Sequence, residues 1–193
     1  MKGLDSMDQP LAGKSIAILV ANGFEELEMT EPQRALLKTG AALRTISPEQ
    51  GLVNGWHGKS WGHYFPVDKQ VGEVLGADYD MLLLPGGERS VAKLQQSAHT
   101  RRIVGHFLDA GKPIAAIDQG IQLLAIAGKL KGRQVAAPEA IRAELEAAGA
   151  QPSDEPLVVD NVTITALGHD QLADFVEQVV KVFSDAAAVR KAA

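Results

Sequence analysis

Three short apolar runs of the sequence are each followed by residues that could bind or transform a ligand. These residues offer carboxylates or backbone amides: Glu25, Glu26 and Glu28 after residues 15–21, Gly86, Gly87 and Glu88 after residues 81–84, and Asp118 and Gln119 after residues 113–117. Because ligands bind outside the carboxyl ends of the strands in open α/β sheets, we expect these groups to gather at one edge of a sheet. Asp118 lies at a strand-to-helix junction, where nucleophile elbows are built and where the amides of the following helix favour an anion.

Each of these residues also has a structural explanation that needs no ligand. Aspartate is a favoured helix N-cap, so Asp118 could serve only to begin a helix over residues 119–128. The glutamates could be exposed charges in a first helical turn, and Gly86–Gly87 could form a simple turn. Histidines in loops are more often surface residues than acids or bases; here these are His57, His63 and His169.

The elements that must position these groups alternate between strand and helix patterns. Wholly apolar runs such as residues 81–84 indicate a sheet that is covered on both faces, and hence parallel strands. Amphipathic helices are expected over residues 24–39, with Pro32 in the first turn or at a kink, and over residues 172–183. This alternation with short loops predicts an α/β fold, a doubly wound, mostly parallel sheet sandwiched by helices.

Two segments depart from that alternation. Asp160–Asn161 separates two apolar runs, residues 157–159 and 162–165, and predicts a two-residue hairpin. Residues 50–68 fit neither period, which favours a long ordered loop or small hairpin, a kind of segment that is often functional. This segment is rich in aromatic and imidazole rings: Trp56, His57, Trp61, His63, Tyr64 and Phe65.

Composition excludes several classes of function. The chain has 193 residues, 46% hydrophobic and 22% charged, which suits one globular domain. Its net charge of −5 argues against nucleic acid and anionic membranes as main partners. The chain contains no cysteine, so a disulfide, a thiolate metal site and a cysteine nucleophile are all excluded. No apolar run approaches the ~20 residues that span a bilayer.

Taken together, the segments resemble the ThiJ/PfpI superfamily. This superfamily has the flavodoxin-like, class I glutamine amidotransferase-like fold and includes the Parkinson-disease protein deglycase and intracellular protease I. The resemblance spans about residues 14–183. It rests on five segments: the first-strand motif (residues 21–28), a loop of the bacterial stress-protein branch (55–68), the glycine turn (84–87), the elbow strand with its helix (111–133) and the late hairpin (158–165).

The chain departs from the family pattern at the elbow. The family motif Ala-Ile-Cys-His-Gly has Asp118 here in place of the cysteine and Gln119 in place of the histidine. The family's Ser-Arg after the late strand is Ala166–Leu167, and its following Pro-Asp is His169–Asp170. Because the family's protease, deglycase and glyoxalase activities are assigned to the cysteine, the resemblance implies that this chain lacks all three by that mechanism.

The resemblance also assigns roles to the candidate residues. Glu28 matches the family glutamate that touches the cysteine, so Asp118 and Glu28 are expected to lie within hydrogen-bonding range and to share a proton. A divergent member of this kind would bind or process a small polar molecule in its carboxyl pocket, in a stress response. The alternative is an active hydrolase or hydratase. Asp118 would then be its nucleophile or general base, and the amides of Gly86, Gly87 and Gln119 would be oxyanion donors.

The remaining expectations concern the pocket wall, the partners and the domain limits. Glu88, His57, Trp61 and His169 are expected near the pocket, with neither a metal nor a cofactor required. The domain is expected over residues 14–185, between a flexible arm at residues 1–13 and a tail at residues 186–193. We expect the protein to be cytoplasmic, to bind a small-molecule ligand and to form a homodimer. The dimer follows from the resemblance alone.

Overall fold

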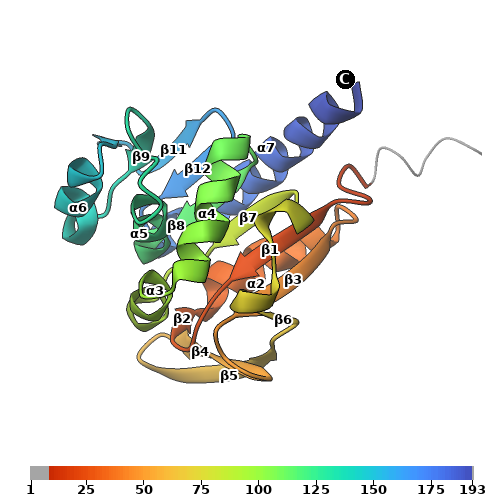
Figure 1. Ribbon diagram of the computed structural model, residues 1–193, viewed down its shortest axis with the longest axis horizontal. Helices are drawn as coiled ribbons and strands as arrows, with labels where there is room; N and C mark the ends of the chain where they lie inside the picture. The colour runs from red at the N-terminus through yellow and green to blue at the C-terminus, as the bar shows by residue number, and fades with distance from the viewer. Residues whose placement is uncertain (1–8, 193) are drawn as a thin grey trace, which may run out of the picture.

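A seven-stranded sheet forms the centre of the protein in the computed structural model, which describes residues 9–192. The strand order is β11-β12-β8-β7-β1-β3-β6, and all neighbours are parallel except β11 and β12. The strands are β1 (Ser15–Leu19), β3 (Ala42–Ser47), β6 (Lys69–Gln70), β7 (Met81–Leu84), β8 (Ile114–Ile117), β11 (Leu157–Asp160) and β12 (Thr163–Ala166). The expected mostly parallel sheet is therefore confirmed (Figure 1).

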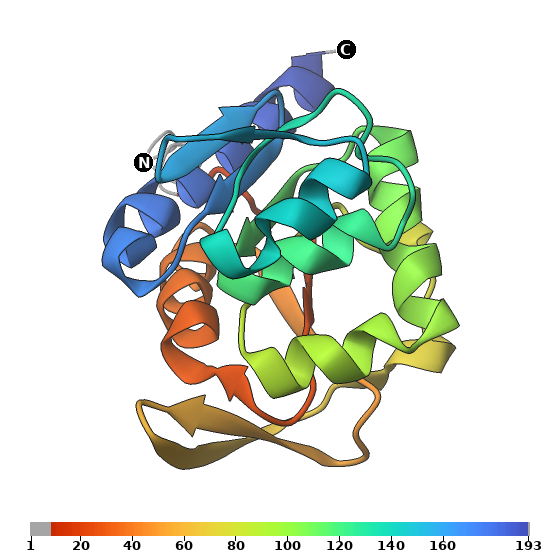
Figure 2. The same ribbon diagram turned by 90° about the vertical axis from the view of Figure 1, so that its left-hand side faces the viewer.

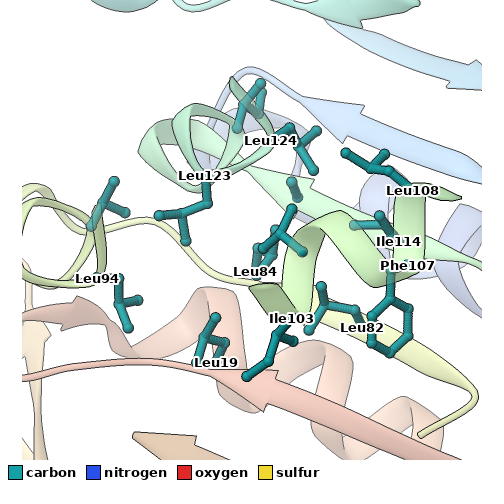
Figure 3. Packing of buried hydrophobic residues seen from close by; sticks show 14 of the residues in the cluster. Leu19, Leu82, Leu84, Leu94, Ile103, Phe107, Leu108, Ile114, Leu123 and Leu124 are labelled. Atoms are coloured by element: carbon teal, nitrogen blue, oxygen red, sulfur yellow. The ribbon is translucent and has the colours of Figure 1, made fainter. Parts of the chain in front are cut away.

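Helices cover both faces of this sheet, which explains why its central strands are apolar throughout. The helices are α2 (Glu26–Leu37), α3 (Glu88–Gln95), α4 (Ala98–Ala110), α5 (Gln122–Ala125), α6 (Arg142–Ala147) and α7 (Leu172–Ala192). One core cluster joins Ile16 and Ile18 of β1 to α2 and α7, and the other joins Leu19 to α3, α4 and α5. Figure 3 shows the second cluster, with Phe107 of α4 against Leu82 of β7.

The segment over residues 50–68 forms a hairpin outside the main sheet. β4 (Leu52–His57) and β5 (Ser60–Pro66) are antiparallel, and β4 also pairs with the two-residue strand β2 (Phe24–Glu25). This hairpin lies along the edge of the molecule below α2 and α3 in Figure 2. A separate two-stranded sheet consists of β9 (Gln134–Ala136) and β10 (Gln151–Ser153).

Several expected boundaries differ in the structure. The helix expected from residue 24 begins at Glu26, because Phe24 and Glu25 pair with β4 as a strand. Pro32 therefore lies inside α2 rather than in its first turn. It has no N–H to donate to the carbonyl oxygen of Glu28, one turn earlier. The late hairpin forms, but its two-residue turn is Asn161–Val162, one residue later than expected, because Asp160 pairs with Thr163. Asn161 has a positive φ of 54°.

The arm and tail expected at the two ends are partly integrated into the domain. Of residues 1–13, the structure describes residues 9–13, where Leu11 is fully buried and its N–H donates to the carbonyl oxygen of Thr39 at 2.9 Å. Residues 1–8 lie outside the described residues. The expected tail continues α7 to Ala192, and Ala187 is buried in the core. Within residues 9–192, no helix has the length and apolar character that crossing a membrane requires.

Candidate functional site

Asp118 follows β8 at the edge of the sheet where β1, β7 and β12 also end. It has a φ of 56°, a left-handed conformation that costs about 1–2 kcal/mol for a residue with a side chain. The 3₁₀ helix Asp118–Ile121 has Ile117 at its N-cap position, so Asp118 is the first residue of that helix rather than its N-cap. A Cβ on Gly120 would lie 2.3 Å from the carbonyl oxygen of Leu84, so only glycine lets this turn approach β7 so closely.

Asp118, Glu28 and Gln119 converge on Gly86, in the loop after β7. A Cβ added to Gly86 would lie within 3 Å of an atom of each: 2.5 Å from Glu28 Oε1, 2.9 Å from Asp118 Cβ and 2.9 Å from Gln119 Oε1. The sheet therefore brings the two predicted carboxyl residues together around one glycine. A direct hydrogen bond between the two carboxyl groups is not among the contacts of the described residues.

Two of the backbone amides expected to hold an oxyanion already have partners inside the protein. The N–H of Gly86 donates to Glu28 Oε1 at 2.9 Å, and the N–H of Gly87 donates to Gln119 Oε1 at 2.9 Å. The backbone amide of Gln119 acts on Asp118 by lowering the pKa of its carboxyl group. An oxyanion could reach the amides of Gly86 and Gly87 only by displacing a side chain.

Burial sets the protonation of the two carboxyl groups. Glu28 is 2% exposed, and burial, with the nearby charge of Asp118, raises its pKa to about 9 against the opposing hydrogen bond from Gly86. Burial also raises the pKa of Asp118, against the opposing amide of Gln119. At neutral pH Glu28 is therefore the protonated member of the pair, and its second oxygen can donate a hydrogen bond.

A cavity of about 400 Å³ opens over the two carboxyl groups. It is lined by Glu25, Leu27, Glu28, Trp56, His57, Gly58, Asp118 and His169. Burial and the charge of Asp118 raise the pKa of Glu25, while His169 and His57 lower it. His57 and His169, both expected near the pocket, thus line this cavity.

A second cavity of about 310 Å³ adjoins the first, because both are lined by Glu25 and Trp56. Glu88 and Arg89 lie there, with Gly23 and Gln119. Trp61, expected near the pocket, lines neither cavity and instead packs edge-on against Trp56, with ring centroids 5.3 Å apart. Trp56 and Arg89 were not predicted as pocket residues, and Glu25 was expected only among the carboxylates at this edge of the sheet.

The comparisons with known proteins agree on one family. The sequence matches the DJ-1/PfpI family over residues 14–182. The chain belongs to the DJ-1/PfpI family. Protein/nucleic acid deglycase 2 of Escherichia coli (strain K12) is 34% identical over 170 residues, which cover 87% of this chain and 96% of that protein.

Solved structures of DJ-1/PfpI proteins share the fold. The ThiJ/PfpI domain protein from Brachyspira murdochii matches with a TM-score of 0.80 at 23% identity, covering 91% of this chain and 98% of that one. A two-domain protein from Anabaena variabilis, with DJ-1/ThiJ/PfpI-like and ferritin-like domains, matches with a TM-score of 0.80 at 28% identity, covering 87% of this chain and 47% of that one. This member of the family has no cysteine and hence no thiol nucleophile.

Glu26 fixes the β4–β5 hairpin against α2 and so positions part of the pocket wall. Its carboxylate is 4% exposed and accepts hydrogen bonds from His57 Nδ1 at 3.1 Å and from the N–H and Nδ1 of His63 at 2.8 and 2.7 Å. Burial opposes ionisation, but the hydrogen bonds from His63 and His57 outweigh it and leave the pKa of Glu26 below its usual value. A Cβ at Gly55 or Gly62 would lie 2.9 or 2.6 Å from this side chain, so both glycines permit the approach.

We expect Glu26→Gln to destabilise the fold by about 1–3 kcal/mol and to speed amide exchange at His63, because glutamine has one acceptor oxygen where the carboxylate has two. This stabilisation is present above the usual pKa of glutamate and is lost as the pH falls through the lowered value. Urea unfolding and hydrogen exchange at neutral pH measure both effects. Glu177→Gln, at an exposed position of α7, is the control. Unchanged exchange at His63 would show that Glu26 does not hold the hairpin.

The carboxylate and histidine groups of the site do not form a recognisable metal centre. Among residues 9–192, no group of three or more histidine, aspartate or glutamate side chains is arranged to hold a metal ion. The chemistry that the arrangement offers is that of a neutral carboxylic acid beside an ionisable carboxylate, with two histidines at the rim.

Proposed function

We propose that the pocket over Asp118 and Glu28 binds a small polar molecule. The observation that carries this proposal is the pairing of a buried, protonated Glu28 with Asp118 under a cavity of about 400 Å³. Such a pair offers one hydrogen-bond donor and one acceptor side by side, which suits a ligand with both kinds of group. We also propose that Asp118 stands at the position of the family's nucleophilic cysteine, supported by its positive φ at a strand-to-helix junction.

A second candidate function is hydration or hydrolysis with Asp118 as general base or nucleophile and Glu28 as acid. The raised pKa of Asp118 favours it, because a base is most useful when its pKa approaches the working pH. The occupied amides of Gly86 and Gly87 favour hydration over acyl transfer, since acyl transfer needs free donors for an oxyanion.

A ligand screen by thermal shift tests the binding proposal. The wild type, Asp118→Asn and Glu28→Gln are each compared for the change in Tm that a compound produces, with Asp185→Asn on the exposed side of α7 as the control. We expect at least one polar compound to stabilise the wild type and the control but not Asp118→Asn. Shifts that are the same in all four proteins would contradict the proposal. Turnover of the compound that both pocket variants abolish would establish the second candidate.

The expectations of a dimer and of a stress response rest on the family alone. We propose a cytoplasmic homodimer that acts in a stress response. Light scattering coupled to size exclusion measures the mass, and a value near the 20.5 kDa of one chain would contradict the dimer.

A further inference from the structure

Arg89 lies in the first turn of α3, where two aromatic rings fix its guanidinium. The guanidinium carbon lies 5.4 Å from the ring centroid of Trp56 and 5.3 Å from that of Trp61. The stem of the side chain passes over Gly23, where an added Cβ would lie 2.8 Å from Arg89 Cβ. Cation–π contact with two rings orders a side chain that would otherwise be free at the surface.

The guanidinium of Arg89 has no partner for its N–H donors among residues 9–192. Glu25 and Glu88 line the same cavity, yet neither carboxylate lies within 4.0 Å of Arg89, and no hydrogen bond to the guanidinium forms. Glu88 is exposed, so solvent screens its charge, and a raised pKa reduces the charge on Glu25. The donors of an ordered arginine are therefore open to a ligand.

Arg89 is also placed to reach a molecule bound at Asp118. Its cavity and the Asp118 cavity lie side by side, since Glu25 and Trp56 line both. Of the residues that line these two cavities, Arg89 is the one lysine or arginine. A guanidinium binds a carboxylate or phosphate through two parallel N–H donors, a geometry that lysine does not offer.

We propose that Arg89 is a specificity-determining residue, which recognises an oxyanion, a carboxylate or a phosphate, on the molecule that binds over Asp118. This inference rests on the proposed function of the Asp118 pocket. It narrows the ligand to small molecules with a polar group at one end and an anionic group at the other.

Tryptophan fluorescence gives a direct test, because both tryptophans of the chain contact Arg89. Three compounds are titrated into the full chain: succinamate, succinamide and inorganic phosphate. Succinamate has a carboxylate where succinamide has a second carboxamide. We expect the tryptophan emission to change saturably with succinamate or with phosphate. Succinamide should bind at least about tenfold more weakly than succinamate. The tighter of the two anions identifies the preferred oxyanion.

Variants identify the residue that is responsible. Arg89→Gln is expected to weaken anion binding about tenfold or more, measured by thermal shift because the substitution itself alters the emission. Arg89→Lys is expected to recover only part of the affinity, because lysine keeps the charge without the fork. Arg101→Gln, at an exposed position of α4, should bind like the wild type, and circular dichroism checks that each variant folds.

Four outcomes would overturn the inference. They are equal affinity for succinamate and succinamide, unchanged anion binding in Arg89→Gln, no response to either anion, and anion binding that neither Asp118→Asn nor Glu28→Gln weakens. Binding that depends on Asp118 but not on Arg89 refutes the inference and leaves the proposed pocket intact. Binding that depends on Arg89 but not on Asp118 or Glu28 refutes the joint site and, with it, the proposed function.

Discussion

Glu28→Gln is expected to stabilise the folded protein by roughly 3–4 kcal/mol at pH 7 and by almost nothing at pH 4. The pKa of Glu28 is raised from 4.5 to about 9 by burial and by the charge of Asp118. Between these two values the folded chain holds a proton that the unfolded chain releases. The wild type therefore loses stability as the pH rises from about 4.5 to about 9, at about 1.4 kcal/mol per pH unit.

Glutamine removes this penalty without removing the contacts. Its carbonyl oxygen can accept the N–H of Gly86 as Glu28 Oε1 does at 2.9 Å. Its amide can donate toward Asp118 as the protonated carboxyl can. The side chain at position 28 is therefore neutral at every pH in the variant, and its shape is close to that of the protonated glutamate.

Urea unfolding at pH 4, 7 and 9 measures the difference between the two proteins. Subtracting wild type from variant cancels the titration of groups that both share. Glu155→Gln, at an exposed position, should give no pH-dependent difference. A stability difference for Glu28→Gln that stays constant over this range would mean that Glu28 is not held protonated in the folded state.

Much of the fold follows from local patterns in the sequence. The apolar run Met81–Leu84 predicts a strand that the structure forms as expected. The Asp160–Asn161 signal predicts a hairpin that also forms, with its turn one residue later. The short strands β6, β9 and β10 were not predicted. They contain two or three residues each, several of them polar, and their pairing depends on segments that only the folded chain brings together.

The site was only partly predictable for the same reason. Asp118 is visible because it ends a strong strand pattern, and Glu28 because the resemblance selects it from three nearby glutamates. Arg89 carries no local signal, since its partner Trp56 lies 33 positions earlier in the chain. Glu26 likewise binds histidines 31 and 37 positions away, a contact that exists only once the hairpin packs on α2.

Gly87→Ala is expected to destabilise the protein by about 3 kcal/mol or more. Gly87 has a φ of 110°, and an added Cβ would lie 2.4 Å from the carbonyl oxygen of Gly23 and 2.7 Å from Phe24 Cα. Both atoms belong to the backbone. They cannot move away easily, because the N–H of Gly23 donates to Asn54 at 2.8 Å and the N–H of Glu25 donates to Gly86 at 3.0 Å.

Gly132→Ala separates the two causes. Gly132 also has a positive φ, 77°, but an added Cβ there would meet no atom within 4 Å. Its substitution should therefore cost only the left-handed backbone, about 1–2 kcal/mol. The excess cost at Gly87, measured by urea unfolding, is the contribution of the close approach between the loops after β1 and β7. Equal costs would mean that the two loops can separate freely. In that case the loop after β7 would move together with Gly86. The N–H of Gly86 would then not hold Glu28 in a fixed position.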